Sequence, residues 1–294
     1  MNILNKYNDF LQQKKSDLSS DISFSFELFP PKDFHQKNNN FLSCINKLSL
    51  FNPTFISVTC TAKNNVCNDY TYNAIRNIPK KLNLNVAPHI TCINKSEEEL
   101  TSLAHRYWND GIKSVIALRG DNFLNSNRKC YAYDLVVLLK QVANFDISVA
   151  AYPEGHPEAI NKKIDLMHLK RKIDCGANRA ITQFFFDVDK YLRFRDECVH
   201  IGIDVDIIPG ILPITNFHQL KRFVSITNVN LPDWLINLFL HIHEQDVVVS
   251  QMIGLIICVQ MIQRLCLEGV KSFHFYTLNH YESVYSLCST LKKL

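Results

Sequence analysis

The sequence predicts an α/β protein, a single (β/α)8 TIM-type barrel with extra helical structure between the seventh and eighth strands. Short runs rich in Val, Ile, Phe and Thr recur roughly every 30 residues along the chain. The segments between these runs carry apolar residues at helical spacing, an alternation typical of repeated βα units. Eight such units are present, the number that closes a parallel sheet into a barrel. An open doubly wound sheet gives the same alternation and is the alternative.

The eight strands are predicted where β-branched and aromatic residues are enriched. They are expected at Ser23–Phe29, Thr54–Cys60, Asn85–Cys92, Ser114–Gly120, Ile147–Pro153, Arg179–Phe186, Asp204–Leu212 and Ser272–Leu278.

Helices are predicted between these strands from apolar residues at helical spacing. The clearest are Asn40–Leu50, Ser96–Asn109, Tyr131–Ala143, Asp165–Cys175 and Val188–Ile201. The second begins with Ser96 and has Glu99 three residues later, a capping box. The stretch 213–271 is long enough for two or three further helices.

The whole chain, residues 1–294, is predicted to be one catalytic barrel domain with an N-terminal helical extension over residues 1–20. A chain of 294 residues with 47% hydrophobic content can bury a large core. Residues 1–20 lack the continuous apolar run of a secretory signal, so a cytoplasmic protein is expected. The most apolar stretch, Met252–Val259, is shorter than the roughly 20 residues that span a bilayer, so no membrane segment is expected.

Several functional classes are excluded by composition and by missing motifs. The net charge of +4 is spread along the chain without the basic stripe of a nucleic-acid-binding protein. The sequence contains no G-x-G-x-x-G, P-loop, H-E-x-x-H or G-x-S-x-G motif. Any dinucleotide is therefore expected to be bound by barrel loops, and neither a catalytic metal nor a serine nucleophile is expected.

The active site of such a barrel lies at the carboxyl ends of the strands, where Glu27 is the first candidate. Period-two alternation places Glu27 on the same side as Ser23 and Ser25, opposite Phe24 and Phe26. Since the apolar side meets the helices, Glu27 is predicted to point into the barrel. Desolvation there would favour a protonated acid that donates to substrate. The alternative is an inward carboxylate in a structural salt bridge.

Other strand ends carry groups suited to a large planar heterocycle. Arg119, Gly120 and Asp121 end the fourth strand, where Gly120 permits close approach by a ligand. Asp121 is either a hydrogen-bond acceptor for a heterocycle or a turn residue. Uncharged imidazole, phenol and amide groups supply hydrogen bonds at a ring's edge; they belong to His89, Tyr152, His156 and Gln183. For either histidine taken singly, a structural role is the alternative.

The helix after the fifth strand places Asp165, His168 and Lys172 on one face with Arg171 beside it. Such paired cations can hold a phosphate or diphosphate. The alternative is a solvated helix face with ordinary ion pairs.

Seven separated motifs resemble, in order, the strand-end motifs of bacterial methylenetetrahydrofolate reductases. Each falls at a predicted strand end, and together they span residues 24–279. They are Phe24–Pro31, Pro88–Thr91, Ala117–Asp121, Ala151–Glu158, Gly176–Asp187, Ile208–Pro213 and Phe273–Asn279.

The resemblance implies an enzyme that binds flavin adenine dinucleotide (FAD) and takes hydride from NAD(P)H, with NADH the expected donor. The hydride would pass from reduced flavin to the methylene carbon of 5,10-methylenetetrahydrofolate. The product, 5-methyltetrahydrofolate, would supply methyl groups for methionine. A single site serving both substrates implies a two-step alternating mechanism in which they compete. A homo-oligomer is also expected.

The resemblance also assigns roles to individual residues. Glu27 matches the acid that helps to open the folate ring to an iminium, and Asp121 matches the carboxylate near flavin and pterin. Thr59 matches a nicotinamide contact, and the folate-site positions are Gln183, Gln219, Phe223 and, with Asp121, His280. The flavin contacts would be Ala62, His89, Arg119, Gly120, Asp121, Tyr131, Ala132, Tyr152, His156, Asp165, His168, Arg171 and Lys172.

Four positions depart from the family pattern. The family usually reads Thr-Tyr-Gly-Ala after the second strand, whereas this chain has Cys60 and Thr61 in place of the Tyr and Gly. His168 replaces a common asparagine, and His280 replaces an arginine that meets the folate. These changes leave two alternatives open: a flavin- or folate-binding barrel with impaired turnover, or another flavin-dependent barrel oxidoreductase such as a proline-oxidising enzyme.

Overall fold

The computed structural model describes residues 22–31, 38–60, 67–120, 130–240, 242 and 246–292. The predicted N-terminal extension and two predicted site residues, Ala62 and Asp121, lie outside this part of the chain.

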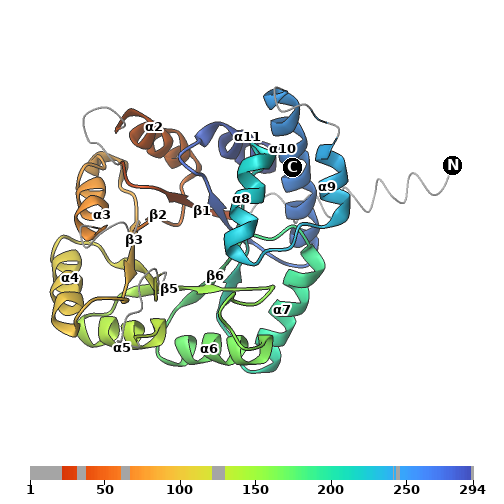
Figure 1. Cartoon of the computed structure of the whole chain (residues 1–294). Coiled ribbons are helices and arrows are strands. Elements are labelled where there is room, and N and C mark those ends of the chain that lie inside the picture. The colour runs from red at the N-terminus through yellow and green to blue at the C-terminus, as the bar shows by residue number, and fades with distance from the viewer. Residues whose placement is uncertain are drawn as a thin grey trace.

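The strands form one parallel sheet that curls into the central barrel seen in Figure 1. Its order is β7-β6-β5-β4-β3-β2-β1-β9-β8, and every printed pairing is parallel. The strands are β1 Ser23–Leu28, β2 Ile56–Val58, β3 Val86–Thr91, β4 Ser114–Leu118, β5 Asp146–Ala151, β6 Arg179–Thr182, β7 Asp206–Ile208, β8 Gly210–Ile211 and β9 Ser272–Tyr276.

The sheet closes because β7 and β8 are two halves of one strand. They are separated by Pro209 alone, which has no N–H to donate to a neighbouring strand. Ile208 in β7 pairs across to β6, and Gly210 in β8 pairs with His274 in β9. The two ends of the sheet order are thus consecutive segments of the chain. The predicted eight-stranded barrel is confirmed, and the open doubly wound alternative is wrong.

Helices surround the barrel and cover the outer face of the sheet (Figure 1). The extra structure predicted before the last strand consists of α8, α9 and α10, and the predicted capping box of Ser96 and Glu99 opens α4. The helices are α2 Asn38–Leu48, α3 Cys67–Arg76, α4 Glu97–Asn109, α5 Ala132–Val142, α6 Lys162–Asp174, α7 Val188–His200, α8 Phe217–Thr227, α9 Asp233–Leu240, α10 Val247–Leu267 and α11 Tyr281–Leu291, with short 3-10 turns at Ser49–Phe51 and Lys80–Leu82.

The largest apolar core lies between the sheet and the helices. Phe24 and Phe26 are buried there, and their rings lie 5.7 and 5.9 Å from the ring of Phe275 on the neighbouring strand. A smaller apolar cluster contains Phe55 and Ile116. The predicted facing of β1 is confirmed, since its phenylalanines pack in the main core while Ser25 and Glu27 approach polar side chains of other strands.

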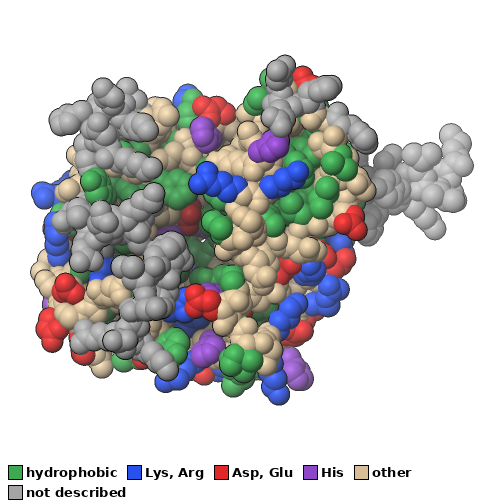
Figure 2. All heavy atoms as spheres, viewed as in Figure 1, with side chains coloured by type: hydrophobic (Ala, Val, Ile, Leu, Met, Phe, Trp, Pro, Cys, Tyr) green, Lys and Arg blue, Asp and Glu red, His purple; other side chains and the backbone are tan. Residues whose placement is uncertain are grey.

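Helix α10 is longer than the apolar stretch Met252–Val259 identified in the sequence. Its length and apolar composition match those of a membrane-spanning helix. Helices in the cores of other proteins meet the same two criteria. One face is buried through residues such as Ile257 and Leu265, and the opposite face exposes Val248 and Met252. Figure 2 shows hydrophobic side chains gathered over the helices that follow β8.

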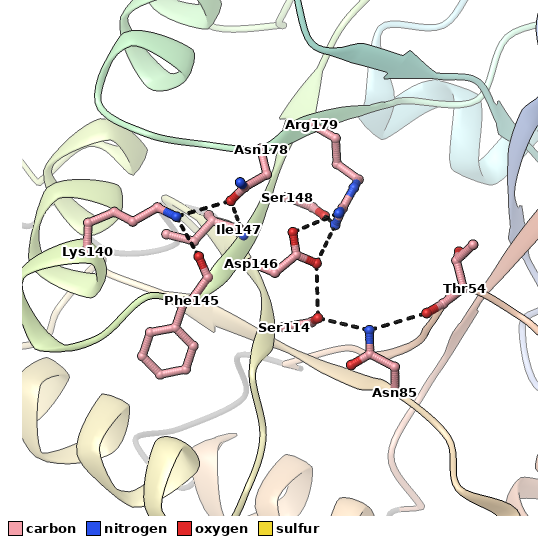
Figure 3. Close-up of polar contacts among 10 residues, drawn as sticks. All are labelled: Thr54, Asn85, Ser114, Lys140, Phe145, Asp146, Ile147, Ser148, Asn178 and Arg179. Atoms are coloured by element: carbon pink, nitrogen blue, oxygen red, sulfur yellow. Dashed lines mark hydrogen bonds and ion pairs between the residues drawn. The ribbon is translucent and has the colours of Figure 1, made fainter.

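Polar side chains at the amino-terminal ends of the strands bind one another (Figure 3). Arg179, the first residue of β6, donates to both carboxylate oxygens of Asp146, the first residue of β5, at 2.7 and 2.8 Å. Ser114 donates to Asp146 at 3.0 Å and accepts from the Asn85 amide at 3.0 Å. The Asn85 amide also donates to the Thr54 carbonyl at 3.2 Å. This network joins the starts of β4, β5 and β6 to the segments before β2 and β3.

Candidate active site

A cavity of about 1170 Å³ lies at the carboxyl-terminal end of the barrel. Its walls come from the ends of β4 and β5, from the starts of α5 and α6, and from Pro30 and Pro31 after β1. Figure 2 shows a hollow near the centre of this face. The predicted site residues that line it are Arg119, Gly120, Tyr131, Ala132, Tyr152, His156, Asp165, His168, Lys172 and Gln183.

Other predicted site residues are described but are not part of this cavity lining. Thr59 is buried just after β2, and Arg171 lies with its guanidinium carbon 3.7 Å from the ring centre of Tyr133. Gln219 and Phe223 lie on α8, and His280 is the N-cap residue of α11. Glu27 and His89 face each other inside the barrel.

Glu27 forms an ion-pair contact with two histidines from different strands. Its Oε2 lies 3.4 Å from Nε2 of His89 and 3.9 Å from Nε2 of His274, and 17% of its side chain is exposed. Burial raises the pKa of the Glu27 carboxyl, but the polar contact with His274 and the charges of both histidines outweigh burial, so the pKa is lowered. The prediction of a resting protonated acid was therefore wrong, because it counted desolvation without these partners.

Gly120 is required by the local backbone as well as by any approaching ligand. Its φ of +91° lies in the left-handed region that favours glycine. A Cβ at this position would lie 2.8 Å from the Ile93 Cγ2 and 3.1 Å from the Thr91 Cβ. The glycine thus lets the end of β4 turn tightly over the end of β3 beside the cavity.

The cation on the cavity side of α6 is held by the end of β5. Lys172 donates to the Ala150 carbonyl at 2.5 Å, and Asp165 accepts the His156 backbone N–H at 3.0 Å. Burial lowers the pKa of Lys172 to about 8, partly opposed by the negative charge of Asp165. A lysine in this setting differs from the freely solvated helix face that was the alternative. It is a partly desolvated cation on the cavity wall.

Aromatic rings at the start of α5 form a stack that the sequence did not fully predict. Tyr131 lies 6.2 Å from His168 and 5.3 Å from Tyr133, with ring planes 12° and 11° apart, and Arg171 caps the outer side of Tyr133. Tyr133 lines the cavity and was missed. The available signal was an aromatic residue in the first turn of the helix after strand four, where a barrel places ligand contacts.

Glu158 is a second cavity residue that sequence reasoning missed. It pairs with Arg119 at 2.6 Å, and this hydrogen bond lowers the pKa of the Glu158 carboxyl. The Glu158 backbone N–H also donates to Nδ1 of His156, whose ring lies 4.6 Å from the Tyr152 ring. Burial lowers the pKa of His156, which favours its neutral form.

The cavity residues fit a ligand with aromatic rings and a diphosphate. The volume exceeds the roughly 300–1,000 Å³ of a site for a drug-sized molecule. Arg119 and Lys172 supply positive charge, and the stack at Tyr131 supplies flat apolar surface. Within the described part of the chain, the buried Nε2 of His89 and Oγ1 of Thr59 have no hydrogen-bond partner. Such atoms near a cavity are suited to a ligand's hydrogen-bonding edge.

Comparison with known proteins decides the family. A sequence model described as methylenetetrahydrofolate reductase matches residues 11–292. The chain belongs to the methylenetetrahydrofolate reductase family. The 5,10-methylenetetrahydrofolate reductase of Escherichia coli K12 is 50% identical over 96% of this chain and 95% of its own length. The reductase of Buchnera aphidicola from Acyrthosiphon pisum is 48% identical over 97% of both chains.

A solved structure supports the fold independently. An uncharacterized protein from Clostridium thermocellum, described as binding two copies of 5-methyl-5,6,7,8-tetrahydrofolic acid, superposes with a TM-score of 0.68. The match covers 96% of this chain and 99% of that one at 15% identity. At this identity the likeness supports the barrel architecture alone.

Proposed function

We propose that this chain is an oxidoreductase that reduces 5,10-methylenetetrahydrofolate to 5-methyltetrahydrofolate, with bound FAD and with NADH as the expected hydride donor. The observation that carries the proposal is an inward carboxyl group, Glu27, at the carboxyl-terminal end of a closed barrel in a chain of this family. The product, 5-methyltetrahydrofolate, would supply methyl groups for methionine synthesis.

The cavity residues would hold FAD by its charged and flat parts. Arg119 and Lys172 would bind the diphosphate, Gly120 would allow close backbone approach, and Tyr131 and His168 would contact an aromatic ring. The remaining flavin contacts would be Ala62, His89, Asp121, Ala132, Tyr152, His156, Asp165 and Arg171. When bound, FAD supplies the capacity to accept a hydride and to release it to a second substrate.

The protein's own groups would orient the folate and protonate it. Gln183 accepts the Phe184 backbone N–H through Oε1 at 3.0 Å, which leaves its amide N–H groups available to a ligand. Glu27 would donate the proton that opens the folate ring, with Asp121 near flavin and pterin. Thr59 would contact the nicotinamide, and Gln219, Phe223 and His280 would complete the folate site. Because both substrates would use one cavity, each should inhibit binding of the other.

The deciding experiment follows the absorbance of the purified protein under anaerobic conditions. A flavin spectrum that bleaches with NADH and returns on addition of 5,10-methylenetetrahydrofolate is expected, with NADPH tested in parallel. A flavin spectrum that does not bleach would instead indicate a binding barrel with impaired turnover. Bleaching by proline would indicate a proline-oxidising enzyme.

Further properties follow from the proposed activity. We expect residues 1–294 to act as one catalytic domain, to work in the cytoplasm on small-molecule substrates, and to assemble as a homo-oligomer. Sedimentation velocity of the purified chain tests the last expectation, because a single species of monomer mass would contradict it.

A further inference from the structure

The turn after β5 carries a carboxylate that joins three segments of the chain. Only 10% of the Glu154 side chain is exposed. Its Oε2 accepts a hydrogen bond from Nζ of Lys190 on α7 at 2.9 Å, and another from the Asn230 backbone N–H at 3.2 Å. Its Oε1 is buried and has no hydrogen-bond partner among the described residues. A single oxygen therefore links the turn after β5, helix α7 and the chain that follows α8.

A second hydrogen bond ties the end of α8 to the same turn. Asn228 is the C-cap residue of α8, with a left-handed φ of +57°, and its side-chain amide donates to the Gly155 carbonyl at 3.3 Å. Val229, the next residue, is buried in the main core. Two successive residues of the turn, Glu154 and Gly155, thus hold the chain immediately after α8.

Helix α8 reaches the cavity at the end that this turn holds. Its last two residues, Ile226 and Thr227, line the cavity. Phe223 lies about one helical turn before Thr227 and Gln219 about two turns before it, so these side chains extend the same face of the helix. The position of α8 at its carboxyl-terminal end therefore decides where Gln219 and Phe223 stand relative to the cavity mouth.

Stability alone is a poor explanation for this arrangement. A buried ion pair contributes little net stability, because desolvation of both charges offsets their attraction. The unpartnered Oε1 of Glu154 costs further stability. What the pair supplies is direction, since a carboxylate held by Lys190 accepts the Asn230 N–H only within a narrow range of distance and angle.

We propose that Glu154 is a positioning residue that fixes α8 beside the cavity and thereby sets the affinity for both substrates, 5,10-methylenetetrahydrofolate and NADH. Lys190 orients the carboxylate, and the chain at Asn228 and Asn230 passes its position on to α8. The inference rests on the proposed function, because the substrate contacts on α8 are assigned there.

The proposed FAD contacts near the same turn are held by other groups. Asp165 accepts the His156 backbone N–H at 3.0 Å, and Lys172 donates to the Ala150 carbonyl at 2.5 Å. Neither hydrogen bond involves Glu154. Loss of the Glu154 carboxylate should therefore displace α8 and leave the FAD contacts in place.

The kinetic test compares KM with kcat in the Glu154→Ala variant. We expect KM for 5,10-methylenetetrahydrofolate and KM for NADH each to rise by about tenfold, because a displaced helix binds both substrates less well. The kcat should stay within about twofold of wild type, since saturating substrate compensates for lost binding. FAD affinity, measured by flavin fluorescence titration, should not change. A loss of kcat at unchanged KM, or weaker FAD binding at unchanged KM, would overturn the proposal.

Two milder variants test the individual hydrogen bonds. Glu154→Gln keeps an oxygen that can accept the Asn230 N–H, so its KM values should lie between those of wild type and Glu154→Ala. An equal rise in both variants would remove Asn230 from the proposal. Asn228→Gly keeps the left-handed backbone but deletes the amide that bonds Gly155, and it should raise both KM values by a smaller factor. Wild-type KM values would remove Asn228.

The matched control is a carboxylate next to Lys190 on the same helix. Asp189 is 52% exposed and pairs with Arg264 on α10, away from the turn after β5. Asp189→Asn removes one negative charge from α7 without touching the chain after α8, so both KM values should match wild type. A rise as large as in Glu154→Ala would show a general effect of charge on α7 and would contradict the proposal.

A measurement without turnover distinguishes failure of this inference from failure of the proposed function. Hydrogen–deuterium exchange of the purified chain should be faster in α8 peptides of Glu154→Ala than in those of wild type, with α5 and α6 peptides unchanged. Unchanged exchange in α8 would contradict the inference even in a chain that reduces the folate. Faster exchange in α8 of a chain that reduces no folate would contradict the proposed function and still assign the position of α8 to Glu154.

Discussion

At the amino-terminal end of the barrel, polar side chains bind one another, whereas toward the carboxyl-terminal end several buried polar atoms of the described residues have no hydrogen-bond partner. Asp146 at the amino-terminal end accepts from both Arg179 and Ser114. On the carboxyl-terminal side, by contrast, the buried atoms that lack a hydrogen-bond partner in the described part of the chain include Thr59 Oγ1, Ser57 Oγ and His89 Nε2, which contacts the Glu27 carboxylate at 3.4 Å without a hydrogen bond. Because an unpartnered buried polar atom lowers stability, its retention at one end indicates use by a ligand. Substitutions at the first end should therefore change stability, and substitutions at the second should change function.

The largest expected effect is on catalysis at the cavity end. Glu27→Gln should lower the rate of 5,10-methylenetetrahydrofolate reduction by about 10²- to 10⁴-fold, the usual contribution of a general acid. Anaerobic flavin reduction by NADH should stay close to the wild-type rate, because that step needs no proton from Glu27. Stopped-flow absorbance measures both steps. Equal losses in the two steps would show that Glu27 has a structural role instead.

The next largest effect is on stability at the opposite end. Arg179→Met should lower the free energy of unfolding by about 1–3 kcal/mol, since it leaves the Asp146 carboxylate without its main partner. Urea denaturation followed by circular dichroism measures this change. The kcat of the folded variant should stay at the wild-type value. A large loss of kcat with unchanged stability would reverse the assignment of the two ends.

A smaller effect concerns FAD affinity and its pH dependence. Lys172→Met should weaken FAD binding by about tenfold or more, because a charge-assisted contact to the diphosphate is lost. In the wild type, FAD affinity should fall as pH rises through about 8, where Lys172 in the FAD-free protein loses its charge. Flavin fluorescence titration at several pH values measures FAD affinity and its pH dependence. If FAD affinity falls equally with pH in the variant and the wild type, Lys172 is not the cause of the fall.

Lys172 should also make the stability of the FAD-free protein depend on pH. Its pKa of about 8 in the folded chain is below the ordinary value of 10.5, so the unfolded chain binds more protons between these two pH values. The contribution of Lys172 to stability should therefore rise with pH across this window. Lys172→Met should remove that part of the rise in a thermal unfolding series.

The smallest effect is expected at the edge of the amino-terminal network. Ser114→Ala removes one hydrogen bond to Asp146 and one from Asn85, but Arg179 still pairs with the carboxylate. The free energy of unfolding should fall by about 1 kcal/mol or less. If Ser114→Ala destabilises the protein as much as Arg179→Met, the network depends on all its members at once.

Much of the fold could be predicted from the sequence because strand and helix periods are local. The prediction placed β1 at Ser23–Phe29, and the structure has Ser23–Leu28. Errors appear at strand ends, where tertiary packing decides. The sixth strand was expected to reach Phe186 but ends at Thr182, and the three phenylalanines that follow are buried ahead of α7. The break at Pro209 was also missed, although a proline within a strand signals it.

The candidate site was predictable as a set of residues more than as a set of interactions. Ten predicted residues line one cavity because every strand of a parallel barrel ends at the same face. The ionisation of Glu27 was predicted wrongly because its partners come from β3 and β9, far along the chain, and only the strand register brings them together. Gln219 and Phe223 were placed in the site by resemblance, and neither lines the cavity, although the last two residues of their helix, Ile226 and Thr227, do.

The pairing of the first strand with the last has a consequence for biosynthesis. Ser23 binds Ser272, and Thr277 binds the Glu27 carbonyl, so the barrel wall that carries Glu27 joins segments that lie 249 to 250 residues apart in the sequence. Before β9 has left the ribosome, β1 lacks one of its two neighbouring strands. Glu27 then also lacks its contact with His274. Contacts of such long sequence separation form late in folding. A chain that lacks β9 is therefore expected to carry Glu27 on an incomplete barrel wall, even when the rest of the cavity wall has been synthesised.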